Sequence, residues 1–141
     1  MSVYLLDVNV LLALAWPSHV HCERAQRWFQ EFGSQGFATC PLTELAFVRI
    51  SSNPSFTKDA VTPHVAGELL LQVKSLPGHH FWPDSLDWSA ASNSVSALAG
   101  HRQVTDAYLL ALAIQNRGVL ATLDRGALAL REPSSPDIRL L

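Results

Sequence analysis

Four acidic residues of this 141-residue chain each lie inside an otherwise apolar segment. They are Asp7, Glu44, Asp106 and Asp124. A carboxylate is costly to bury without a partner, and several carboxylates together repel one another and shift toward the protonated form unless a cation lies between them. The four positions therefore predict a site for a divalent metal ion.

Two of these acids also have a purely structural explanation. Asp7 is placed to cap a helix that begins at Val8, and Asp106 lies in the first turn of a later helix, where the helix dipole favours an anion. This explanation does not extend to Glu44, because residues 42–47 around it are mostly apolar and do not form a solvated face. The metal site accounts for all four acids, and capping accounts for two.

Strand and helix patterns alternate along the chain. Short apolar runs predict strands over 3–6, 37–40, 80–82, 119–123 and, as a final edge strand, 137–141. Helical periodicity predicts helices over 8–15, 21–32, 41–50, 63–76, 87–98 and 106–117. Thr62 and Thr105 are predicted to cap the helices that follow them.

This alternation predicts an α/β fold with a parallel sheet covered on both sides. Ligands of such sheets bind beyond the carboxyl ends of the strands. Asp7 and Asp124 each follow a predicted strand, and Asp106 begins a helix that can point it toward the same edge. Acids far apart in the sequence can therefore converge.

Composition limits the class of protein. With 48% hydrophobic and 16% charged residues, we expect one domain over residues 1–141 with a substantial core. The longest apolar stretch, 8–16, is far shorter than the ~20 residues that span a bilayer, and the N-terminus lacks a basic region with a cleavage site, so we expect a cytoplasmic protein without a membrane segment. Cys22 and Cys40 lack metal or redox spacing and are expected to be free thiols.

Charge and histidine content give no further site. A net charge of −2 gives no sign of the basic surface that is typical of nucleic-acid-binding proteins. Bound cations would nevertheless make the potential of an acidic pocket positive locally. The six histidines, His79 and His80 among them, show no zinc-type spacing and are expected in loops or at the surface.

The quartet of acids, in this order and in a chain of this length, resembles the PIN-domain ribonucleases, and specifically the VapC toxins of bacterial toxin–antitoxin pairs. The matching segments are 5–12 around Asp7, 43–49 around Glu44, 103–109 around Asp106 and 122–126 around Asp124. Any one of these strings alone is a weak signal, but four in the correct order cover nearly the whole chain and make the resemblance fairly specific.

The resemblance implies a PIN-like three-layer α/β/α sandwich with a central, mostly parallel sheet, formed as a single PIN domain by residues 1–141. It implies that Asp7, Glu44, Asp106 and Asp124 are the catalytic acids that hold Mg²⁺ or Mn²⁺, with Asp124 acting directly or through water. The implied activity is that of a toxin, a metal-dependent endoribonuclease that hydrolyses RNA phosphodiester bonds. The implied partners are RNA, a second copy in a homodimer, and a small antitoxin protein in the active-site groove.

Carboxylate-held cations suit this chemistry, because they activate water and stabilise charge on the phosphate without a protein nucleophile. Asn9 and Thr105 could orient water or a metal ligand from behind the acids, or could simply cap helices. Arg102 and Arg125 could contact RNA phosphates, or could form ordinary salt bridges with the acids.

Two rival functions remain. Phosphatases and phospho-acceptor domains also place an aspartate after the first strand, but their D-x-D-x-T pattern is absent, since Asn9 occupies the third position, and neither Lys58 nor Lys74 follows a strand signal. The alternative within the family is a non-catalytic PIN-like scaffold that binds protein or RNA. Four clustered carboxylates argue against a scaffold, because such a cluster is costly to keep without a cation.

Overall fold

The computed structural model describes residues 2–95, 98–132 and 135–141. At its centre is a five-stranded sheet in the order β3-β2-β1-β4-β5, in which all neighbouring strands are parallel. The strands are β1 (Tyr4–Leu6), β2 (Phe37–Thr39), β3 (His79–Phe81), β4 (Val119–Thr122) and β5 (Ile138–Leu140). The prediction of a central parallel sheet is confirmed, and the expected edge strand near the C-terminus pairs with β4.

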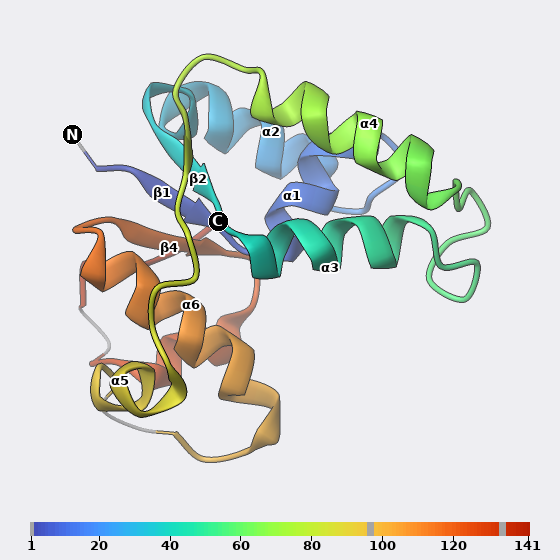
Figure 1. Ribbon diagram of the computed structural model, residues 1–141. Coiled ribbons are helices and arrows are strands. Elements are labelled where there is room, and N and C mark those ends of the chain that lie inside the picture. The colour runs from blue at the N-terminus through green and yellow to red at the C-terminus, as the bar shows by residue number, and fades with distance from the viewer. Residues whose placement is uncertain (1, 96–97, 133–134) are drawn as a thin grey trace.

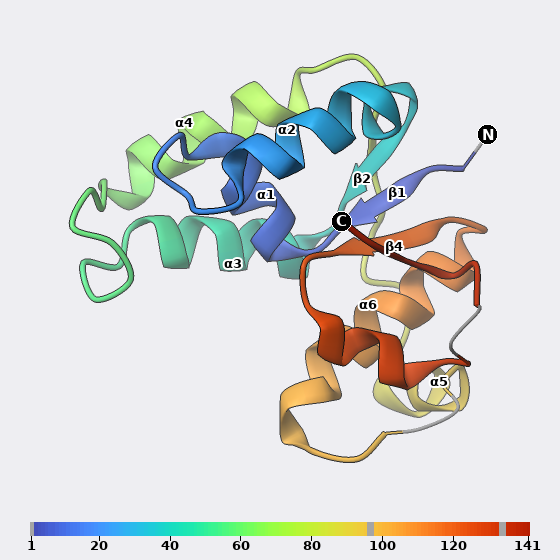
Figure 2. The ribbon, with the colours of Figure 1, turned by 180° about the vertical axis from the view of Figure 1, so that it is seen from behind.

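Helices cover both faces of the sheet (Figure 1). They are α1 (Val8–Ala15), α2 (Cys22–Glu31), α3 (Pro41–Ser51), α4 (Pro63–Lys74), α5 (Trp88–Asn93) and α6 (Val104–Gln115), with short 3₁₀ helices η1 (Gly33–Gln35), η2 (His101–Gln103) and η3 (Arg125–Leu130). The first four α-helices lie on one side, and α5 and α6 lie on the other, where Figure 2 shows η3 beside α6. This is the predicted three-layer α/β/α sandwich. Across the described ranges, none of the helices combines the length and apolar character that a bilayer crossing requires.

The sheet separates two apolar cores, because successive side chains of each strand point to opposite faces. Leu5 of β1 and Leu120 of β4 belong to the core that includes α6. Leu6 of β1 and Phe37 of β2 belong to the core beneath α1 to α4. Burial on both faces is the reason that these strands read as continuous apolar runs in the sequence.

The helix predicted over 87–98 is shorter than expected. Within the described residues α5 ends at Asn93, and residues 96 and 97 lie outside them. The hydroxyls of Ser92 and Ser94 donate to the backbone carbonyls of Ser89 and Ala90, and serine bonds of this kind compete with regular helix. The predicted length was therefore wrong because the serine content outweighed the helical spacing.

The two predicted threonine caps have different outcomes. Thr62 caps α4, since its hydroxyl accepts a hydrogen bond of 3.2 Å from the backbone N–H of Val65. Thr105 does not cap α6, which begins one residue before it with Gln103 at the cap position. The prediction for Thr105 was wrong, because η2 runs directly into α6 and moves its start toward the N-terminus.

Candidate functional site

Asp7 lies where β1 ends and α1 begins, and it is only 4% exposed. Its Oδ1 accepts a hydrogen bond of 2.7 Å from the backbone N–H of Val8, and its Oδ2 accepts one of 2.8 Å from the hydroxyl of Thr122. Burial raises the pKa of Asp7, the two hydrogen bonds oppose this shift, and the charge of Asp124 adds to it. Asp7 thus caps α1, as the structural explanation requires, and is also a buried carboxylate at the carboxyl edge of the central strand.

Thr122 is a site residue that sequence reasoning missed. It is fully buried at the end of β4, donates to Asp7, and accepts a hydrogen bond of 3.0 Å from the backbone N–H of Asp124. One hydroxyl therefore links two of the four acids. The available signal was a polar residue inside the apolar run of β4, two positions before Asp124.

Asp106 and Asp124 lie close to Asp7 in the folded chain. Asp106 is half-buried in the first turn of α6, and its pKa is raised to about 7 by burial, by the charges of Asp7 and Asp124, and by a side-chain hydrogen bond with Asp124. A hydrogen bond between two carboxyl groups requires that one of them keeps its proton. Asp124 is exposed, and its Oδ1 also accepts from the backbone N–H of Gly126 at 2.8 Å.

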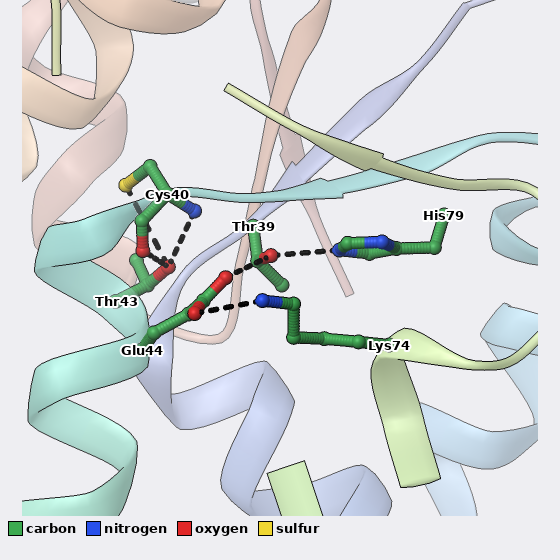
Figure 3. A network of polar contacts seen from close by, with 6 residues as sticks. All are labelled: Thr39, Cys40, Thr43, Glu44, Lys74 and His79. Atoms are coloured by element: carbon green, nitrogen blue, oxygen red, sulfur yellow. Dashed lines mark hydrogen bonds and ion pairs between the residues drawn. The ribbon is translucent and has the colours of Figure 1, made fainter. Parts of the chain in front are cut away.

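Glu44 is held in a different polar cluster (Figure 3). Its Oε1 lies 3.0 Å from Nζ of Lys74, and its Oε2 accepts a hydrogen bond of 2.7 Å from the hydroxyl of Thr39. The Thr39 hydroxyl is also 2.8 Å from Nε2 of His79. The pKa shifts of Asp7 and Asp106 arise from burial and from other aspartates, with no contribution from Glu44.

The four predicted acids are therefore only partly brought together. Asp7, Asp106 and Asp124 act on one another electrostatically, whereas Glu44 is paired with a lysine. Within the part of the chain that the structure describes, no group of three or more His, Cys, Asp or Glu side chains is arranged to hold a metal ion. The predicted ligand set and its metal stay predictions.

His79 and Lys74 were not expected at the site. His79 lies in β3, half-buried, and not in a loop. Burial lowers the pKa of its imidazole, with a further contribution from the charge of Lys74. No sequence motif signals the pair of Lys74 and Glu44, because the two residues are thirty positions apart and meet only through the packing of α4 against α3.

The remaining predicted site residues are at the surface. Asn9 in α1 and Thr105 in α6 are exposed. Arg102 in η2 and Arg125 in η3 are exposed as well. These two 3₁₀ helices contact each other, η2 lies just before Asp106 in the sequence, and Arg125 directly follows Asp124. Cys22 and Cys40 are free, as expected.

The raised pKa of Asp106 predicts how stability changes with pH. Because the folded-state pKa lies above the ordinary value of 3.8, the stabilising contribution of the protonated form is present below about pH 4 and is lost as pH rises toward 7. Asp106→Asn does not titrate, so its stability relative to wild type should grow over this range. The full pKa shift of Asp106 corresponds to about 4 kcal/mol of unfolding free energy. Because Asp106 is partly exposed, we expect the variant to gain only about 1–2 kcal/mol of stability relative to wild type.

Urea unfolding in EDTA at pH 4 and pH 8 measures this difference. Asp59→Asn is the matched control, because Asp59 is exposed in the loop between α3 and α4. A difference between Asp106→Asn and wild type that stays constant with pH would contradict the electrostatic coupling of the three aspartates.

The fold and the site together define a parallel three-layer α/β protein with aspartates at the carboxyl edge of its central strands. The sequence profile of the PIN domain matches residues 4–132. Ribonuclease VapC39 of Mycobacterium tuberculosis is 50% identical over 121 residues, which cover 85% of this chain and 87% of VapC39. Ribonuclease VapC38 of the same bacterium is 46% identical over 135 residues, which cover 94% of each protein. The chain therefore belongs to the PIN-domain family, within the group of VapC ribonucleases.

A solved structure agrees in fold. The crystal structure of VapBC2 from Rickettsia felis, bound to a DNA fragment from their promoter, contains a chain that superposes with a TM-score of 0.64. The match covers 99% of this chain and 97% of that one, at 11% identity. The resemblance identified from the four acidic segments is thus confirmed at the level of family and fold.

Proposed function

We propose that this chain is a metal-dependent endoribonuclease and the toxin of a toxin–antitoxin pair. The observation that carries the proposal is the set of three aspartates at the carboxyl edge of the sheet, Asp7, Asp106 and Asp124. Burial raises the pKa of Asp7 and of Asp106, and the charge of Asp124 adds to both shifts. Its membership of the VapC ribonucleases supports the same activity. Carboxylates that repel one another are suited to a cation, and helix capping by Asp7 and Asp124 does not explain why Asp106 lies beside them.

The donor chemistry of the three aspartates fits Mg²⁺ or Mn²⁺, which prefer carboxylate oxygens. Asp7, Asp106 and Asp124 would hold the ion, and Glu44 would join them only by leaving Lys74. When bound, the ion would supply an activated water and stabilise charge on the phosphodiester. Because the pKa of Asp106 is raised to about 7, binding of the ion near neutral pH would release the proton from those molecules in which Asp106 is protonated.

The chain's own residues orient this site. Thr122 fixes one oxygen of Asp7 and the backbone of Asp124, so that both acids keep their direction toward the same edge. Arg102 and Arg125 would bind RNA phosphates, since both are exposed on turns next to the aspartates. Asn9 would contact water or substrate from the first turns of α1.

A small antitoxin protein would be the protein partner. The similar fold in VapBC2 of Rickettsia felis supports a partner of this kind. A groove of about 300 Å³ that includes Glu44 is lined by the apolar side chains of Leu45 and Phe81, which are 67% and 49% exposed. The homodimer and the cytoplasmic location stay predictions.

The function is tested by incubating the purified chain with labelled bacterial RNA in Mg²⁺, in Mn²⁺ or in EDTA. We expect cleavage only with a divalent ion, and a rise of several degrees in Tm with millimolar Mn²⁺, because the ion binds the folded chain alone. Monovalent salt at equal ionic strength should change Tm much less.

The outcomes separate the two candidate functions. A rise in Tm with Mn²⁺ but no cleavage of any RNA would support the non-catalytic scaffold. Identical melting curves in EDTA and in Mn²⁺ would contradict the metal site itself.

A further inference from the structure

Lys74 is the cation that the structure pairs with Glu44, one of the four predicted acids. Its Nζ lies 3.0 Å from Oε1 of Glu44, and the two side chains are only 26% and 16% exposed. The ammonium group also lies 5.2 Å from the centre of the Phe81 ring, a cation–π contact. As the last residue of α4, Lys74 has its charge at the negative end of the helix dipole. Three interactions thus hold this ammonium in place.

The other oxygen of Glu44 is also engaged. The Thr39 hydroxyl has one proton, and it donates that proton to Oε2 of Glu44. The contact between Thr39 and Nε2 of His79 therefore needs the imidazole as its donor. Because Thr39 is fully buried at the end of β2, this directional chain from His79 through Thr39 to Glu44 is fixed (Figure 3).

Glu44 and Asp7 have the same kind of first hydrogen-bond partner but different second partners. Each acid accepts a hydrogen bond from a buried threonine at the end of a strand beside β1, Thr39 in β2 for Glu44 and Thr122 in β4 for Asp7. The second partner of Asp7 is the uncharged backbone N–H of Val8, whereas the second partner of Glu44 is a lysine. Glu44 therefore has a full positive charge beside it, whereas the second partner of Asp7 is uncharged.

We propose that Lys74 is a positioning residue that acts as an internal counter-ion of Glu44 and limits the part that Glu44 takes in metal binding. The inference rests on the proposed metal site of the three aspartates. Lys74 occupies Oε1 of Glu44, the oxygen that this acid would otherwise offer to a cation, and the charge of Lys74 would repel any cation that Glu44 approached. Removing that charge therefore strengthens metal binding for two reasons, since one more carboxylate is available and one positive charge is gone.

The experiment measures the affinity of the full chain for Mn²⁺ by isothermal titration calorimetry. Lys74→Met keeps the length and the apolar contact with Phe81 and removes the charge. We expect Mn²⁺ to bind about three- to tenfold more tightly than to wild type, while Tm in EDTA falls because Glu44 loses its partner. Lys74→Arg, which keeps the charge, should bind Mn²⁺ as wild type does.

Lys58→Met is the matched control, because it removes the same charge from an exposed position between α3 and α4. Its Mn²⁺ affinity should stay within about twofold of wild type, since exposed charges outside the site are screened. In a Glu44→Gln background, Lys74→Met should give a smaller gain, because only the loss of repulsion remains. Lys74→Gln, which retains a hydrogen-bond donor for Glu44, replaces Lys74→Met if the methionine variant does not fold, and it should shift affinity in the same direction.

Failure of this inference and failure of the proposed function look different. Wild type that binds Mn²⁺ in a manner abolished by Asp7→Asn, with equal or weaker binding to Lys74→Met, overturns the role of Lys74 alone. Absence of Mn²⁺ binding to wild type and to Lys74→Met alike overturns the metal site and, with it, the inference that depends on it.

Discussion

Replacing Asp7 with asparagine is expected to lower RNA cleavage by about a thousandfold or more while leaving the protein folded. Asp7 is the most buried of the four acids and lies next to both Thr122 and the aspartates. Asparagine keeps an oxygen for the backbone N–H of Val8, so the cap of α1 survives. It also removes a buried negative charge that neighbouring carboxylates repel, so Tm in EDTA should stay equal or rise.

The assay is cleavage of labelled RNA with Mn²⁺, together with melting curves in EDTA. Asp59→Asn, the same chemical change at an exposed acid, should cleave as wild type does. A large loss of stability in Asp7→Asn would mean that the capping role dominates and that Asp7 is structural. Cleavage at the wild-type rate by Asp7→Asn would remove the central residue from the proposed mechanism.

Expression of the wild-type chain alone is expected to arrest the growth of a bacterial host. Each copy of a ribonuclease cuts many RNA molecules, so colony counts should fall by orders of magnitude after induction. Asp7→Asn, expressed to the same level, should not arrest growth. Coexpression of a small protein encoded beside the toxin should restore growth, with a basic side chain entering the acidic pocket in place of the metal.

Growth curves and colony counts measure the arrest, and immunoblots establish that the variants accumulate equally. Normal growth with abundant wild-type chain would end the toxin interpretation but leave the nuclease interpretation intact. Arrest by wild type and by Asp7→Asn alike would mean that growth is inhibited by something other than cleavage.

The sequence predicted those features that depend on local pattern. The three central strands β1, β2 and β4 were readable because both of their faces are buried, and the carboxyl-edge rule placed Asp7 and Asp124 at one side of the sheet. The start of α6 and the length of α5 were predicted wrongly, since a preceding 3₁₀ turn and serine side chains shifted their boundaries.

The partners of the acids were not predictable in the same way. Lys74 contacts Glu44 only because α4 packs against α3. From the sequence alone, a lysine at the end of a helix is expected to extend its charge into solvent. The sequence predicts Thr39 and Thr122 only as strand residues, since threonine is common in strands. Their hydrogen bonds to Glu44 and Asp7 depend on the folded sheet, in which β2, β1 and β4 lie side by side.

The middle position of β1 in the sheet also determines when the acidic site can form while the chain is being synthesised on the ribosome. β1 pairs with β2, which is the next strand in the sequence, and with β4, which is translated much later. The hydrogen bond between Thr122 and Asp7 joins positions 115 residues apart. A nascent chain that has not reached β4 lacks Thr122, Asp124 and one neighbouring strand of β1, so the acidic site cannot form before β4 has been synthesised.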